Sequence, residues 1–337
     1  MKRFSILAAL LVAVLAVAAA GCGGGDGDGD EQAGGAGEQE TPKVAVLFPG
    51  LVDDNSWNEA GFTGLTKAKD EGVETSYLEN VSHEKQLEAF QNFARKDFGV
   101  VIGHGGEYMA SAMRAARDFP DVHFVVVNGN ESASNVTSIA LNYGDMGYIS
   151  GVLGAHMSKS KKLGVVAGEH IPIVDDGIGG MKAGAASVGN GTTVRSTIID
   201  SWTDVAKARE ASLALVNAGV DALWPFLDAA ETGVISAAED EGVMSIAVYH
   251  DIRKLAPKTY VGGAWSDPGA VILEAATNGD ALDGSVKFVG AQEDAVVLAP
   301  FADNVPANVR KEVEAAYDAL KSGEVDSLEE AKKAASN

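Results

Sequence analysis

The fold is decided by the stretch Val44-Ala45-Val46-Leu47-Phe48-Pro49-Gly50-Leu51-Val52-Asp53-Asp54-Asn55-Ser56-Trp57-Asn58-Glu59-Ala60-Gly61. The apolar, β-branched run from Val44 to Phe48 predicts a buried strand. A polar loop follows it, and the segment from Trp57 to Glu71, closed by Gly72, predicts a helix. Strand, loop and helix in this order are the repeating unit of a parallel α/β sheet.

The same unit recurs through the first half of the chain. Further strands are expected near Thr75, over Val100–Ile102 and over Phe124–Val127, with helices over Glu84–Lys96 and Tyr108–Asp118. Glycine-rich turns follow these strands. Because such turns lie at the carboxyl edge of a sheet, where open α/β folds place their ligands, we expect a binding site there.

A second series of strands and helices begins near residue 162. Strands are expected over Lys162–Ala167, Val194–Ile199, Ala222–Trp224 and Ser245–Val248, and helices near Gly179–Ser187, Ala206–Ala218 and Ala229–Glu241. After Tyr260-Val261-Gly262-Gly263 come another helix and strands near Val286 and Val296, which have no obvious place in a completed second sheet. We therefore expect these late elements to return to the first lobe.

The expected architecture is an α/β clamshell of two doubly wound parallel-sheet lobes joined by several crossings. About 295 residues follow position 42, which exceeds one ordinary hydrophobic core. Lobe 1 is predicted to comprise residues 43–145 plus about 263–337, and lobe 2 about 146–262.

The N-terminus has the pattern of an export signal. A basic start, an apolar run from Ile6 to Ala20 and small residues precede Cys22, the only cysteine. This pattern predicts a bacterial lipoprotein signal peptide over residues 1–21 and lipid attachment at Cys22, although a strict motif has leucine in place of Ala19. The alternative is an uncleaved anchor helix, for which the run is short and alanine-rich compared with a span of about 20 residues.

Residues 22–42 contain mainly glycine with aspartate and glutamate, and they predict a flexible acidic tether. The protein is thus expected at the cell membrane, lipid-anchored on its extracytoplasmic face. The net charge of −22 argues against nucleic acid or an anionic lipid surface as a partner, and it also suits a soluble extracellular domain. Contact with the membrane is expected through the lipid alone.

Signals for an enzyme are weak. His104-Gly105-Gly106 resembles an oxyanion-hole loop, but the sequence has no Gly-x-Ser-x-Gly nucleophile motif. Gly177-Ile178-Gly179-Gly180 lacks the glycine spacing of a dinucleotide-binding loop. His104 with Glu107 alone is a poor metal pair. We expect no catalytic activity, cofactor or metal ion.

The four tryptophans, Trp57, Trp202, Trp224 and Trp265, all fall at expected lobe edges. Trp57 follows a polar loop, where its ring offers a stacking face worth roughly 1 to 3 kcal/mol to a planar ligand. Trp224 ends an expected strand, so it could pack in the core instead of contacting a ligand. Asn58 could bind a ligand or brace the loop, and Asp228, which follows Trp224, could face the ligand or cap a helix. The clustering favours a planar or cationic ligand.

Several motifs together carry a family resemblance. The stretch from Val46 to Gly61, with Gly103–Tyr108, Pro120–Phe124 and Ser201–Asp204, resembles the basic membrane protein family, also called the purine nucleoside receptor family. The resemblance covers the chain from Lys43 onward. It implies the type I periplasmic-binding-protein fold and a substrate-binding lipoprotein of an ABC transporter. Its implied partners are a small-molecule ligand and an ABC permease with its ATPase, and the protein is expected to be a monomer.

The resemblance also implies site residues. It places stacking aromatics at Trp57 and Trp202. The family's base-binding aspartate corresponds to Phe48, and its ribose-binding aspartate and lysine correspond to Tyr249 and Trp265, unless a small shift restores His250 or Asp251. Asn128 stands where another aspartate is usual. The expected ligand-binding residues are Phe48, Trp57, Asn58, His104, Asn128, Trp202, Asp228, Tyr249 and Trp265.

The sequence therefore predicts an extracytoplasmic solute-binding lipoprotein that takes a purine nucleoside or purine base between two lobes. Loss of the charged ribose partners favours the base, since buried ribose hydroxyls would lack hydrogen bonds. One alternative is a ligand-sensing lipoprotein that signals without transport. Another is an exported enzyme on the same fold.

Overall fold

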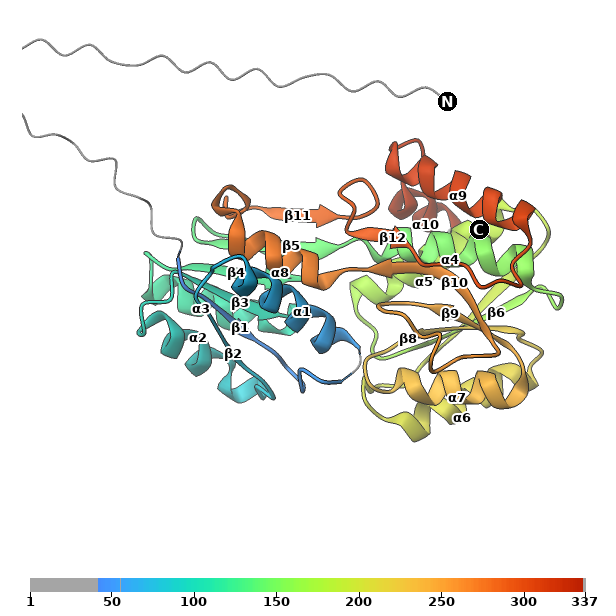
Figure 1. Cartoon of the computed structure of the whole chain (residues 1–337), viewed down its shortest axis with the longest axis horizontal. Coiled ribbons are helices and arrows are strands. Elements are labelled where there is room, and N and C mark those ends of the chain that lie inside the picture. Colours follow the sequence, from blue (N-terminus) through green and yellow to red (C-terminus); the bar gives the residue numbers. More distant parts are fainter. Residues whose placement is uncertain (1–41, 55, 336–337) are drawn as a thin grey trace, which may run out of the picture. The chain divides into compact units, whose positions relative to one another are not determined.

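Two six-stranded sheets carry the fold. The computed structural model describes residues 42–54 and 56–335 (Figure 1), so the expected signal peptide and Cys22 lie outside the described residues. Sheet 1 is wholly parallel in the order β11-β5-β4-β3-β1-β2. Its strands are β1 (Val44–Leu47), β2 (Thr75–Leu78), β3 (Val100–His104), β4 (His123–Val127), β5 (Val136–Leu141) and β11 (Val286–Val289).

Sheet 2 has the order β12-β10-β9-β8-β6-β7 and is parallel except for its edge strand β12. Its strands are β6 (Lys162–Ala167), β7 (Thr193–Ile198), β8 (Ala222–Phe226), β9 (Met244–Ala247), β10 (Tyr260–Ser266) and β12 (Val296–Leu298). The expected α/β class with two doubly wound sheets is confirmed.

The buried strands explain why the sequence reads as continuous apolar runs. In β1, Val44 and Val46 pack into one hydrophobic cluster, and Ala45 and Leu47 pack into another on the opposite face. Both faces of a parallel sheet are covered by helices, so both sets of side chains leave water. Alternation between polar and apolar residues is therefore absent.

Helices cover both faces of each sheet (Figure 1). On sheet 1, α1 (Trp57–Asp70) and α8 (Pro268–Thr277) pack together on one face, and α2 (Gln86–Ala94) and α3 (Met109–Asp118) on the other. On sheet 2, α6 (Val205–Asn217) and α7 (Glu231–Glu241) cover one face, and α4 (Tyr143–Met157) and α5 (Pro172–Ser187) the other. α9 (Ala307–Lys321) and α10 (Ser327–Ala335) pack outside α4 and α5. Short 3₁₀ turns occupy η1 (His83–Lys85), η2 (Gly106–Tyr108) and η3 (Gly279–Ala281).

The chain after residue 260 is shared between the two sheets. Strand β10 belongs to sheet 2, α8 and β11 return to sheet 1, and β12, α9 and α10 lie with sheet 2. This differs from the expectation that about 263–337 returns as a whole to lobe 1. The physical reason lies in α4, whose residues from Tyr143 to Ala155 are all buried. A helix that is apolar all round needs cover on its outer side, which α9 and α10 supply.

Backbones of α4 and α5 approach each other closely. A Cβ added to Gly147 would lie 2.0 Å from the carbonyl oxygen of Gly177, and one added to Gly151 would lie 2.2 Å from that of Met181. A Cβ on Gly180 or Gly184 would meet backbone of α4 in the same way. Only glycine permits this separation.

Three crossings connect the sheets within the described residues, at Asn142, at Asp267 and over 290–295. They are hydrogen-bonded to one another. The Asn142 N–H donates to the Val289 carbonyl at 2.8 Å, and the Asp267 N–H donates to the Ala295 carbonyl at 3.0 Å. Asp145, in the first turn of α4, accepts from the Ala291 N–H at 2.9 Å. None of the described helices is both long and apolar enough to cross a membrane.

Candidate ligand-binding site

Loops from both sheets meet where β1, β3, β6, β8 and β9 end. The ring of Trp57, at the start of α1, lies with its centroid 5.9 Å from that of Tyr249, which follows β9. Asp228, which follows β8, lies close enough to Asp54 and Glu107 on sheet 1 for their charges to raise its pKa. We call this region the strand-end site. It is the edge at which the sequence analysis expected a ligand.

Trp57 is held from below by two buried rings. It stacks on His104 with centroids 4.3 Å apart and planes 15° from parallel. The His104 Nε2–H donates to the Trp57 carbonyl at 3.0 Å, and the Trp57 Nε1–H donates to the His104 carbonyl at 3.4 Å. Burial lowers the pKa of His104 to about 4, so its imidazole is neutral at physiological pH. Phe48 packs edge-on against His104, with centroids 5.2 Å apart.

These contacts place Phe48 and His104 in the core, where neither has exposed surface. Trp57 itself is only 7% exposed. Of the sequence-predicted residues, His104 therefore covers one face of the Trp57 ring and Phe48 packs against His104, and neither reaches the surface of the strand-end site.

Asn58 braces the loop before α1. Its Nδ2 donates to the Asp54 carboxylate at 2.7 Å, while backbone N–H groups of Ser56, Asn58 and Glu59 donate to the same carboxylate. Asp54 thereby satisfies N–H groups at the start of the helix. The buried Oδ1 of Asn58 has no hydrogen-bond partner within residues 42–54 and 56–335.

Asn128 ties sheet 1 to the start of α4. Its backbone has the left-handed φ of 60° that asparagine tolerates. Its Nδ2 donates to the Tyr143 hydroxyl at 3.0 Å, and its Oδ1 accepts from the Leu141 N–H at 3.1 Å. The amide thus positions Tyr143, a residue that the sequence analysis missed.

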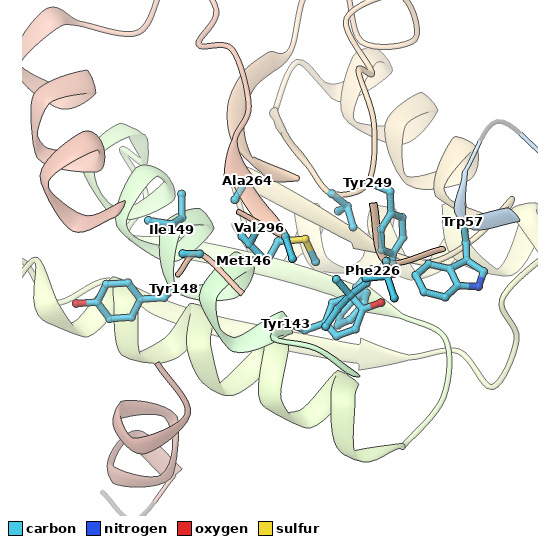
Figure 2. Packing of buried hydrophobic residues seen from close by; sticks show 14 of the residues in the cluster. Trp57, Tyr143, Met146, Tyr148, Ile149, Phe226, Tyr249, Ala264 and Val296 are labelled. Atoms are coloured by element: carbon cyan, nitrogen blue, oxygen red, sulfur yellow. The ribbon is translucent and has the colours of Figure 1, made fainter. Parts of the chain in front are cut away.

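A row of aromatic rings runs from Trp57 into sheet 2 (Figure 2). Tyr249 contacts Trp57 and also Tyr143, the latter with centroids 6.5 Å apart. Phe226 lies 5.1 Å from Tyr143 and 5.0 Å from Trp224, again between centroids. Trp224 has no exposed surface, and its Nε1–H donates to the Ala247 carbonyl at 3.2 Å, which makes it a core residue.

The remaining two tryptophans are half-buried on sheet 2. Trp202 lies over Gly168, where a Cβ would approach its ring to 2.3 Å. Trp265 packs beside a small cluster that includes Ile235 and Ile252, and its Nε1–H has no hydrogen-bond partner among the described residues. In the described part of the chain, no direct ring contact joins Trp202 to Trp57.

Carboxyl groups are concentrated at the strand-end site. Glu231 opens α7 and is only 1% exposed. Its Oε1 lies 2.9 Å from His250 Nε2, and its Oε2 has no hydrogen-bond partner in the part of the chain that the structure describes. Burial, with Asp228 and Asp54 nearby, raises the pKa of Glu231 well above the usual range. Burial also raises the pKa of half-buried Asp228, with Asp54, Glu107 and Glu169 adding to the shift, and it lowers the pKa of His250.

Sequence reasoning missed Glu231 as a site residue. The signal was available, because Asp228 and Glu231 follow a buried strand at its carboxyl end. An acidic residue in the first turn of a helix is usually explained by the helix dipole, so Glu231 was not considered as a ligand-binding residue.

Comparison with known proteins agrees with this architecture. The family model described as "ABC transporter substrate-binding protein PnrA-like" matches residues 41–326. The purine-binding protein BAB2_0673 of Brucella abortus is 30% identical over 300 residues, covering 87% of this chain and 84% of that protein. The transcriptional activator protein Med of Bacillus subtilis is 27% identical, over 80% of this chain and 86% of that protein.

A solved ABC transporter solute-binding protein from Aeropyrum pernix superimposes with a TM-score of 0.74 at 16% identity, covering 85% of this chain and 92% of that one. This likeness confirms the expected type I periplasmic-binding-protein fold. With a family model that spans most of its length, the chain belongs to the PnrA-like family of ABC transporter substrate-binding proteins.

Proposed function

We propose that this protein is the extracytoplasmic, lipid-anchored receptor of an ABC importer, and that it delivers a purine base or nucleoside to a membrane permease. The observation that carries the proposal is the strand-end site, where loops of both sheets bring together aromatic rings and buried polar atoms without partners. The Brucella relative is named a purine-binding protein, and a Lactococcus lactis relative is named a nucleoside-binding protein.

In this proposal Trp57 and Trp202 stack on the two faces of the ligand, and Tyr249 and Asp228 contact its edge. Stacking on an aromatic side chain is worth about 1 to 3 kcal/mol per base. Phe48 and His104 act indirectly by holding Trp57. Asn58, Asn128 and Trp265 complete the proposed set of ligand-binding residues. The Oδ1 of Asn58 and the Nε1–H of Trp265, which have no hydrogen-bond partner among the described residues, would bond the ligand.

A free purine base should bind at least tenfold more tightly than its nucleoside. Phe48, Tyr249 and Trp265 stand where the family resemblance implies charged groups for base and ribose, so ribose hydroxyls would be buried without partners at roughly 1 to 3 kcal/mol each. Calorimetry with adenine against adenosine, and hypoxanthine against inosine, measures the difference. Tighter binding of both nucleosides would contradict the correspondence of these three positions.

The lipid anchor has its own test. Replacing Cys22 with alanine should leave the precursor uncleaved by the lipoprotein peptidase or move the protein out of the membrane fraction, because the proposed lipid attaches to that thiol. Fractionation and intact-mass measurement of both forms give the answer. A variant that is still cleaved and lipidated would exclude Cys22 as the anchor.

The match to a protein named transcriptional activator supports sensing without transport as the second candidate. Uptake of labelled ligand separates the two. If the protein serves transport, deleting its gene lowers ligand uptake. If it serves sensing, the deletion leaves uptake unchanged and alters gene expression.

A further inference from the structure

The strand-end site has an excess of acidic side chains. Asp54 and Glu107 come from sheet 1, and Glu169, Asp228 and Glu231 come from sheet 2. No ion pair among the described residues joins a lysine or arginine to any of these five. His250 lies beside Glu231, and burial lowers the pKa of that imidazole, which favours its neutral form.

Glu231 supplies an independent sign of a missing ligand. Its side chain is almost completely buried, yet its Oε2 atom makes no hydrogen bond to any described residue. A buried polar atom without a partner costs about 1 to 3 kcal/mol, and native proteins keep few of them. Burial raises the pKa of this carboxyl, and the charges of Asp228 and Asp54 make its ionisation still less favourable. A hydrogen-bond donor from a ligand would remove both costs.

The chemistry of the donor follows from the neighbouring groups. When ionised, carboxyl oxygens accept hydrogen bonds and attract positive charge, and they repel an oxo or anionic group of a ligand. The rings of Trp57 and Tyr249, each 7% exposed, lie at the same site, and aromatic rings also attract cations. An amino or ammonium group on a planar ring system could donate hydrogen bonds to the carboxyl oxygens while its ring contacts the aromatic side chains.

We propose that the strand-end site selects a ligand carrying an amino or ammonium group, and that this group binds the Glu231 carboxyl beside Asp228. This inference rests on the proposed binding of a planar solute at the same site. It adds a discrimination that stacking alone does not give, since adenine and hypoxanthine stack alike but carry an amino and an oxo group at the same ring position.

The test compares adenine, hypoxanthine and the aromatic amine tryptamine by calorimetry on wild-type protein and on Glu231→Gln. The wild type should bind adenine at least tenfold more tightly than hypoxanthine, and Glu231→Gln should reduce that ratio to near one. The matched control is Glu241→Gln, at the exposed far end of the same helix, which should keep the wild-type ratio.

Folding of Glu231→Gln is checked by thermal unfolding. A carboxyl whose pKa is raised in the folded state binds its proton more tightly there, so its ionisation destabilises the fold as pH rises above the ordinary carboxyl range. Glutamine keeps the size and carries no charge. At neutral pH the variant should therefore unfold at or above the wild-type temperature.

The outcomes separate this inference from the proposed function. A preference for adenine or tryptamine over hypoxanthine that depends on Glu231 supports the inference. Whichever of these two compounds binds more tightly shows whether the Glu231 carboxyl prefers a neutral amino group or an ammonium ion. Binding of tryptamine without any purine keeps the inference and removes the purine proposal. Equal or tighter binding of hypoxanthine keeps the purine proposal and overturns the inference, and binding of none of the three overturns both.

Discussion

Replacing Gly147 with alanine should destabilise the protein by about 3 kcal/mol, at the upper end of what overpacking usually costs. The added methyl group would lie 2.0 Å from the Gly177 carbonyl oxygen, which is backbone and cannot rotate away. Relief requires α4 and α5 to separate, and α4 is buried along nearly its whole length. Urea unfolding followed by circular dichroism measures the change as a lower midpoint.

The control for this substitution is Gly279→Ala. That glycine has no heavy atom within 4 Å of an added Cβ, so its effect should stay within about 0.5 kcal/mol. A Gly147→Ala midpoint equal to that of the control would mean that the two helices do not pack as closely as described.

Trp57→Ala and Trp202→Ala should each weaken binding of the preferred ligand by at least tenfold, about 1.4 kcal/mol. Each removes a stacking face. Trp57 also packs on His104, and truncating a buried tryptophan costs about 3 to 5 kcal/mol of stability, so affinity has to be measured on the folded fraction. Trp57→Phe keeps a ring and should lose less than Trp57→Ala.

A core tryptophan provides the comparison for both. Trp224→Phe should lower stability through its lost hydrogen bond to Ala247 and leave affinity nearly unchanged, because Trp224 has no exposed surface. Calorimetry and thermal unfolding report the two effects separately. If folded Trp57→Ala and Trp202→Ala both bind like the wild type, the ligand site lies elsewhere on the molecule.

Strands with β-branched runs could be predicted from the sequence because their burial on both faces leaves a continuous apolar stretch, as in β1 and β3. Helix α4 could not. It is buried on every side and contains four glycines, so it has neither an amphipathic period nor the composition of a helix. Strand β10 was hard to predict because two adjacent glycines, Gly262 and Gly263, are typical of a turn. In the structure both have positive φ values and lie where β10 forms a bulge against β9.

The site shows a similar limit. Position after a strand identified Trp57 and Asp228 as strand-end residues, because the carboxyl edge of a parallel sheet is set by topology, and the family resemblance added Tyr249. It could not show that His104 is buried beneath Trp57, since stacking depends on side-chain rotamers. Nor could it show that the Asn128 amide is bonded to Tyr143 and Leu141, residues from the following strand and helix.

The three hydrogen-bonded crossings limit the mechanical freedom of the molecule. A single linker would let one sheet rotate and translate freely against the other. Here three backbone segments are hydrogen-bonded together at Asn142, Asp267 and Ala291, so one segment cannot move without the other two. Asp145 adds a further bond from the Ser327 hydroxyl at 2.6 Å, which fastens the third crossing and the start of α10 to α4. We therefore expect any relative rotation of the sheets to turn about an axis through the crossings, which would bring the same two sets of loops face to face.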